Sequence, residues 1–93
     1  MIIEINNKRY KVIKDEDKTI DINMLEEMMT DYFDCYDYIV GDWAYNKLRL
    51  KGFNKKNNKF YKEINDYNKV DSYIKNNCAY GCKYFILEKL ENK

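Results

Sequence analysis

Residues 37–53 read DYIVGDWAYNKLRLKGF and have the pattern of a β-hairpin, with strands at 37–43 and 47–53 and a turn at 44–46. In the second strand, leucines alternate with cations: Lys47, Leu48, Arg49, Leu50 and Lys51. Successive side chains of a strand point to opposite faces, so the leucines share one face and the cations share the other. One face is therefore expected to pack on a core, while the other is wet or covered by a polar partner.

The same stretch joins two blocks of opposite charge. From Thr19 to Asn46 the chain has seven acidic residues and no Lys or Arg, and from Trp43 to Lys62 it has seven basic residues and no acid. The formal net charge of +1 therefore hides a strongly dipolar chain. Such asymmetry is a physical clue to a partner.

Residues 24–36 show the spacing of an amphipathic helix, because apolar side chains recur every three or four positions. They are Leu25, Met28, Met29, Tyr32, Phe33 and Tyr36. Asn23 is the expected N-cap, with Glu26 three positions later in a capping-box arrangement. Asp31 and Asp34 would then lie at the negative end of the helix, which disfavours them. We therefore expect cations from elsewhere, such as the basic block, to lie nearby.

The remaining segments complete an α+β fold. Short apolar runs at 2–5 and 10–13 predict a first hairpin around two asparagines, which tolerate the positive φ of a tight turn. Apolar spacing at Val70, Tyr73 and Ile74 predicts a second helix, with Asn68 as its cap. The run CKYFIL at 82–87 is apolar enough for a central strand buried on both faces.

The expected order is ββαββαβ: a mixed or antiparallel sheet with two helices, in a single domain covering residues 1–93. The longest apolar runs are only about four residues, far short of the roughly 20 that span a membrane. The first residues, MIIEINNKRY, have no signal-peptide core, so we expect a cytosolic protein with its three cysteines reduced.

Catalytic residue patterns are scarce. The chain has no His, which removes the usual general base and the commonest metal ligand. No spacing identifies a nucleophile, a carboxylate pair or a phosphate-binding glycine loop. We therefore expect no enzymatic activity, no catalytic residues and no cofactor.

Together, the hairpin at 37–53 and the stretch CAYGCKYFILEK at 78–89 resemble the YutD-like family of small proteins from low-G+C Gram-positive bacteria. The first hairpin and the first helix occur in a compatible order, so the resemblance covers most of the chain. It implies a small α+β domain and nothing catalytic.

We interpret residues 45–62 as a candidate interface with RNA or a ribonucleoprotein. Every second side chain of a strand is about 6.6–7 Å from the next, close to the phosphate repeat of an extended single strand, and flanking aromatic rings could stack on bases. The candidate residues are Tyr45, Lys47, Arg49, Lys51, Phe53, Lys55, Lys56 and Lys59.

Two other interpretations of the cations stay open. They can form an ordinary solvated face, paired across the hairpin with Asp37 or Asp42. Alternatively, the acidic helix 24–36 and the basic strand 47–53 are the two poles of a protein-interaction or adaptor module, in which charge governs the rate and orientation of encounter.

Two smaller groups of residues are also candidates. Gly41, Asp42 and Trp43 could form a recognition pocket, or Trp43 could be a core aromatic and Asp42 a turn-forming acid. Three cysteines, Cys35, Cys78 and Cys82, could bind zinc only with a carboxylate as fourth ligand. A redox pair or small core residues are the alternatives, and we expect core residues and no metal.

Overall fold

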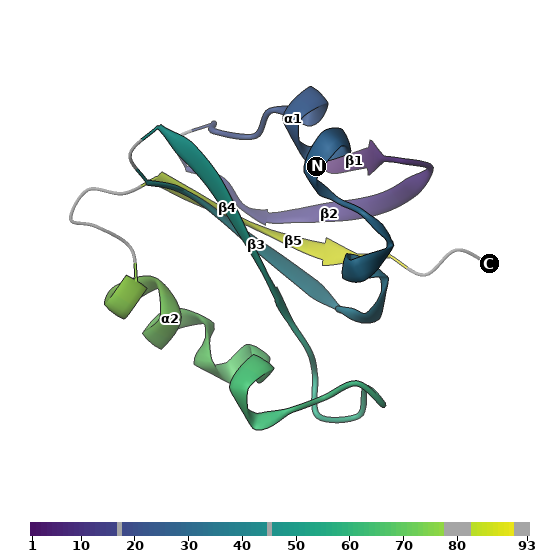
Figure 1. Ribbon diagram of the computed structural model, residues 1–93, viewed down its shortest axis with the longest axis vertical. Coiled ribbons are helices and arrows are strands. Elements are labelled where there is room, and N and C mark those ends of the chain that lie inside the picture. The colour runs from purple at the N-terminus through teal and green to yellow at the C-terminus, as the bar shows by residue number, and fades with distance from the viewer. Residues whose placement is uncertain (17, 45, 78–82, 91–93) are drawn as a thin grey trace.

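The structure, a computed structural model, describes residues 1–16, 18–44, 46–77 and 83–90. These residues form a five-stranded antiparallel sheet in the order β1-β2-β5-β3-β4 (Figure 1). The strand bounds are β1 Ile2–Ile5, β2 Lys8–Lys14, β3 Tyr38–Ala44, β4 Lys47–Phe53 and β5 Lys83–Lys89. The last strand thus lies in the middle of the sheet, as its apolar run predicts.

One α-helix covers each face of the sheet (Figure 1). Helix α1, Ile22–Met28, packs on one face, and helix α2, Val70–Asn77, packs on the other. The described elements therefore follow the expected order ββαββαβ, with additional short 3-10 helices. The α+β class and the small single domain are confirmed.

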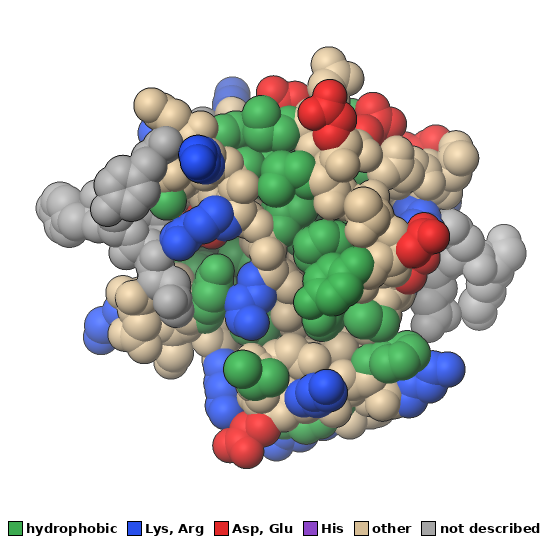
Figure 2. Space-filling view, in the orientation of Figure 1, with side chains coloured by type: hydrophobic (Ala, Val, Ile, Leu, Met, Phe, Trp, Pro, Cys, Tyr) green, Lys and Arg blue, Asp and Glu red, His purple; other side chains and the backbone are tan. Residues whose placement is uncertain are grey.

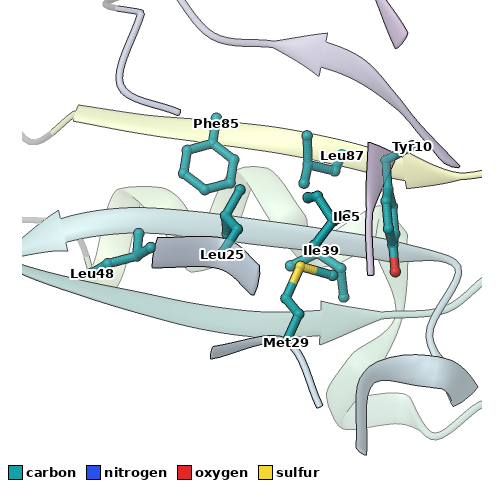
Figure 3. Packing of buried hydrophobic residues seen from close by; sticks show 8 residues of the cluster. All are labelled: Ile5, Tyr10, Leu25, Met29, Ile39, Leu48, Phe85 and Leu87. Atoms are coloured by element: carbon teal, nitrogen blue, oxygen red, sulfur yellow. The ribbon is translucent and has the colours of Figure 1, made fainter. Parts of the chain in front are cut away.

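The larger core lies between the sheet and α1. Side chains from all five strands and from α1 point toward one another there (Figure 3). They are Ile5, Tyr10, Leu25, Met29, Ile39, Leu48, Phe85 and Leu87. Fully burying a side chain of this size stabilises the fold by about 1.5–3 kcal/mol. This layer holds β3 and β4 in register with β5.

A second core lies between the sheet and α2. Tyr38, Val40, Phe53 and Ile86 alternate with the residues of the first core along their strands, and they pack against Val70 of α2. The ring of Tyr38 stacks on Tyr67, with ring centroids 3.6 Å apart. Strands β3, β4 and β5 are therefore apolar on both faces here. This confirms the prediction of a strand buried on both faces for β5, which begins at Lys83. Cys82, the first residue of the predicted run, lies outside the described residues.

The first hairpin turns at Asn6 and Asn7, whose φ angles are 51° and 67°. Both central residues of a type I′ turn need positive φ, so the prediction of an asparagine turn is confirmed. The Asn6 side-chain amide donates to the carbonyl oxygens of Glu26 (3.1 Å) and Met29 (3.0 Å). The turn therefore also ties β1 to the C-terminal end of α1.

The prediction of one helix over 24–36 is wrong. Helix α1 ends at Met28, Met29 and Thr30 are extended, and a separate 3-10 helix spans Asp31–Cys35. The break places Asp31 and Asp34 in the first turn of the second helix. A helix N-terminus carries partial positive charge, so the break removes the conflict that a continuous helix would create.

Both predicted helix caps are wrong as well. The side chain of Asp21, and not that of Asn23, accepts from the backbone N–H of Met24 and caps α1. Before α2 the chain forms a 3-10 helix, Tyr67–Lys69, and the Asp66 carboxylate accepts from the N–H of Asn68. In each case an Asp two positions earlier takes the role assigned to an Asn.

Candidate functional site

The alternation along β4 is as expected, but the cationic face is not an open track. Leu48 is buried in the core beneath α1, and Lys47 and Arg49 are exposed on the opposite face. Phe53, at the end of that face, is 1% exposed and packs beneath α2. Its ring is therefore covered by the protein itself, so the proposed stacking platform at this position is wrong.

Arg49 is neutralised across the hairpin by Asp42. The two residues are cross-strand partners, and the Arg49 guanidinium donates from Nε to Asp42 Oδ2 at 3.2 Å and forms an ion pair with the same oxygen. Asp42 is 2% exposed, whereas the Arg49 side chain is 46% exposed. The pairing across the hairpin with Asp42, one of the alternatives that the sequence allows, is therefore present.

The other candidate cations are dispersed. The ammonium of Lys51 lies 5.6 Å from the ring centroid of Phe53 and 5.8 Å from that of Tyr73. Lys55 lies 5.6 Å from the ring of Tyr38 and 3.7 Å from the Glu88 carboxylate. In the loop after β4, Lys56 and Lys59 are exposed, and Tyr45 lies outside the described residues.

Gly41, Asp42 and Trp43 do not form one pocket, because successive residues of β3 point to opposite faces. A Cβ atom on Gly41 would lie 2.1 Å from the ring of Phe85, so glycine allows that ring to pack on the strand. Asp42 points to the α2 side, where Arg49 pairs with it. Trp43 is half-buried beside the first core, and its indole N–H donates to the carbonyl of Thr19 at 3.1 Å.

Asp34, in the acidic block, finds its cations in β2 and β5. Lys8 of β2 forms an ion pair with the Asp34 carboxylate, and Lys89 of β5 donates to the Asp34 carbonyl. The expectation that cations lie near this acid is confirmed, but among these contacts they do not come from the basic block.

The described residues also form a groove that sequence analysis did not predict. It has a volume of about 670 Å³ and runs along β4, between the 3-10 helix Asp31–Cys35 and the loop that follows β4. Its lining residues are Tyr32, Phe33, Cys35, Tyr36, Arg49, Leu50, Lys51, Gly52, Lys59, Phe60, Tyr61, Lys62, Ile64, Asn65 and Tyr73. Four of these are Lys or Arg, and none of the described lining residues is acidic.

Several groove side chains are hydrophobic and exposed. Tyr32 is 65% exposed, Phe60 49% and Ile64 74%. Figure 2 shows one face of the molecule, where hydrophobic side chains lie between Asp and Glu, mainly toward the top and right, and Lys and Arg, mainly on the left and in the lower half. Exposed apolar side chains gathered in one groove with polar residues around them mark an interaction site.

One wall of the groove is a small aromatic cluster. The hydroxyls of Tyr32 and Tyr36 are 3.0 Å apart, and their rings pack edge to face. The hydrogen bond between Tyr36 and Tyr32, together with burial, raises the pKa of Tyr36 to about 12. A Cβ on Gly52 of β4 would lie 2.1 Å from the Tyr36 ring, so this glycine lets the ring lie directly on the strand.

The opposite wall is fixed by buried asparagines. Asn54 is fully buried, and its side-chain oxygen accepts from the backbone N–H of Asp37 (2.8 Å) and from the amide of Asn58 (3.1 Å). Asn65 Oδ1 accepts from the N–H of Lys62 at 2.8 Å. The stretch after β4, which includes the lysines of the candidate interface, is therefore ordered against β4 by its own amide side chains.

A metal site and a membrane span find no support in the described residues. No group of three or more His, Cys, Asp or Glu side chains among them could hold a metal ion, and no described helix is long and apolar enough to cross a membrane. Cys35 is half-buried and its thiol donates to the carbonyl of Tyr32 at 3.5 Å. Cys78 and Cys82 lie outside the described residues.

The chain matches a known family over most of its length. The family model described as "Putative antitoxin YutD-like" covers residues 4–88. A relative named "Putative antitoxin YutD", from Bacillus subtilis (strain 168), is 33% identical over 89 residues, which are 96% of this chain and 98% of the relative. The chain therefore belongs to the YutD-like family, as the motifs at 37–53 and 78–89 indicated.

The fold is also similar to a solved structure. The solution NMR structure of protein YutD from B. subtilis is 32% identical, covers 99% of this chain and 84% of that one, and aligns with a TM-score of 0.77.

Proposed function

We propose that this chain is a protein-binding module and that it holds its partner in the groove along β4. The observation that carries the proposal is the exposed apolar set Tyr32, Phe60 and Ile64 in a groove whose described lining has four cations and no acid. Apolar contacts supply affinity, while charges of one sign select and orient a partner of the opposite sign.

The relatives support a protein partner. The B. subtilis relative is named an antitoxin, and we extend that role to this chain: it binds a toxin protein and restrains it by contact. A small module with no recognised catalytic pattern can act on a protein in this way. The non-enzymatic role, the cytosolic location and RNA binding by residues 45–62 stay predictions.

A capture experiment with matched variants tests this function. Tagged wild-type protein and the groove variant Tyr32→Ser/Ile64→Ser are incubated with lysate of the native host, with and without ribonuclease. The control variant, Ile2→Ser/Ile13→Ser, removes exposed apolar side chains (53% and 43% exposed) from β1 and β2 at the other end of the sheet. Circular dichroism verifies that all three proteins are folded.

We expect a protein that survives ribonuclease and is bound by the wild type and the control variant but lost from the groove variant. A partner bound equally by all three proteins would overturn the assignment to the groove. Bound material that disappears with ribonuclease would instead support the RNA interpretation.

A further inference from the structure

Strand β4 lies at the edge of the sheet, and half of its backbone groups face away from β3. The backbone N–H of Asn54 bonds outward to the carbonyl of Asn65 at 2.7 Å, and its carbonyl accepts from the N–H of Tyr67 at 3.0 Å. Hydrogen-bonding direction alternates along a strand, so the same groups of Leu48, Leu50 and Gly52 face this edge. Within the described residues they have no backbone partner there.

The chain itself shows that this edge accepts an added segment. Residues 65–67 run alongside the end of β4 and form a parallel bridge between Asn54 and Asp66. The bridge occupies only that end of the edge. Over the five residues from Leu48 to Gly52, about 17 Å at a rise of about 3.3–3.4 Å per residue, the outward backbone groups have no backbone partner among the described residues.

The two sides of the open edge differ in chemistry. On the α1 side lie Leu50 and the rings of Tyr32 and Tyr36. On the α2 side lie Lys51 and Arg49, the latter already paired with Asp42, and Lys59 and Lys62 contribute further positive charge to the groove. A strand added at this edge would alternate its side chains between an apolar and a basic environment.

We propose, on the basis of the proposed function, that the partner supplies an extended acidic segment that adds as a sixth strand to β4. Its backbone pairs with Leu48, Leu50 and Gly52. Its apolar side chains lie against Leu50 and Tyr36, and the alternate, acidic side chains face Lys51 and the groove lysines Lys59 and Lys62. The partner segment therefore has alternating acidic and apolar residues.

Charge argues against a second copy of this chain as the occupant. Two β4 edges paired with each other would bring the lysines of one strand, Lys47 and Lys51, close to those of the other. Like charges on paired strands are destabilising, and cations on an edge strand are a common defence against self-association. An acidic partner strand would not be repelled by these cations.

Peptide titrations followed by amide NMR test the proposal. The probe is a peptide of about seven residues with alternating Glu and Val, long enough to cover the ~17 Å edge. A second peptide replaces each Glu with Lys. A third peptide keeps the Glu-Val sequence but carries N-methyl groups on every second amide. A fourth carries them on the remaining amides. Whichever set of amides faces β4, one of these two peptides cannot form the backbone hydrogen bonds.

We expect saturable shifts of the Leu48, Leu50 and Gly52 amides with the Glu-Val peptide, at a Kd of up to about 1 mM. One N-methylated peptide and the Lys peptide should bind at least about ten-fold more weakly. The protein variant Lys51→Glu/Lys59→Glu should lose affinity for the Glu-Val peptide by a similar factor. Its control, Lys11→Glu/Lys75→Glu, makes the same charge change at exposed sites away from the groove and should not.

Two results would overturn strand addition. One is equal binding of both N-methylated peptides, and the other is the absence of saturable shifts at these three amides. The proposed function fails separately, through a captured partner that does not depend on Tyr32 and Ile64. The two experiments can also disagree. If the partner is lost from the groove variant but both N-methylated peptides bind equally, the groove remains the binding site and only the added strand is rejected.

Discussion

Gly41 and Gly52 each let an aromatic ring lie on a strand, but the ring over Gly52 is freer to move than the ring over Gly41. Phe85, over Gly41, is 0% exposed and enclosed by the first core, whereas Tyr36, over Gly52, is half-buried at the rim of the groove. A Cβ would lie 2.1 Å from the ring at both positions. The loss of stability caused by adding a Cβ atom therefore depends on whether the ring can move.

We predict that Gly41→Ala lowers the free energy of unfolding by about 1–3 kcal/mol, the usual range for overpacking a core. Gly52→Ala should cost less, because Tyr36 can turn into the groove. Urea unfolding of the two variants measures the difference. Equal losses would show that Phe85 moves as easily as Tyr36, contrary to its enclosed position.

The ion pair of Asp42 and Arg49 leads to a second prediction at the residue scale. Removing Arg49 leaves a carboxylate that is 2% exposed without its charged partner, whereas neutralising Asp42 leaves a guanidinium that is 46% exposed. Arg49→Met should therefore lower the free energy of unfolding by about 1–3 kcal/mol, and Asp42→Asn should cost less.

The double variant Asp42→Asn/Arg49→Met provides the control. It should be more stable than Arg49→Met alone, since a neutral amide then replaces the unpaired carboxylate. Thermal unfolding at one pH compares the three proteins. A double variant less stable than Arg49→Met would contradict this account of the pair.

At the element scale, the cap of α1 is directly testable. Asp21 accepts from the N–H of Met24 at 3.1 Å, and Asn23 lies inside the helix. Loss of an N-cap side chain typically costs about 1 kcal/mol. We predict that loss for Asp21→Ala and a much smaller one for Asn23→Ala, measured by urea unfolding. The reverse order would support a helix that starts after Asn23.

The strands could be predicted from the sequence because their signals are local. Leucines alternating with cations at 47–51 predict a half-buried strand, and the apolar run at 82–87 predicts a strand buried on both faces. The break after Met28 could not be predicted in this way, since neither Gly nor Pro marks it. Tyr32 and Tyr36 keep the helical spacing of core residues, so periodicity alone assigned them to a buried face.

The groove could not be predicted because it depends on the whole molecule. Its walls come from residues 32–36, 49–52 and 59–65, and they meet only once β4 lies at the edge of the sheet. No single segment of the sequence specifies the order of the strands in the sheet. The signal that was available is the alternation in β4, which indicated a strand face that a polar partner could cover.

At the scale of the whole molecule, tyrosine burial makes stability sensitive to alkaline pH. The pKa of Tyr38 is raised, first by burial and then by its hydrogen bond to Glu88 (2.9 Å). Burial also raises the pKa values of Tyr10, Tyr67 and Tyr73. Above the ordinary tyrosine pKa of about 10, the unfolded chain therefore binds fewer protons than the folded chain.

The unfolding free energy should accordingly be constant with respect to these groups below pH 10 and fall as the pH rises further, by up to about 1.4 kcal/mol per pH unit for each such tyrosine. Tyr38→Phe keeps the ring but removes one titrating group. Urea unfolding at several pH values between about 9 and 11 should show a shallower fall for this variant. Identical slopes would mean that Tyr38 titrates normally in the folded protein.

Binding of a partner protein along the edge of β4 can be tested on the complex itself. The most direct measurement is amide hydrogen exchange of this protein alone and bound to the partner captured through the groove. We predict slower exchange at Leu48, Leu50 and Gly52 in the complex and no change in β1. Slower exchange confined to α1 and the 3-10 helix Asp31–Cys35, with β4 unchanged, would contradict binding along β4 and place the partner on the acidic pole.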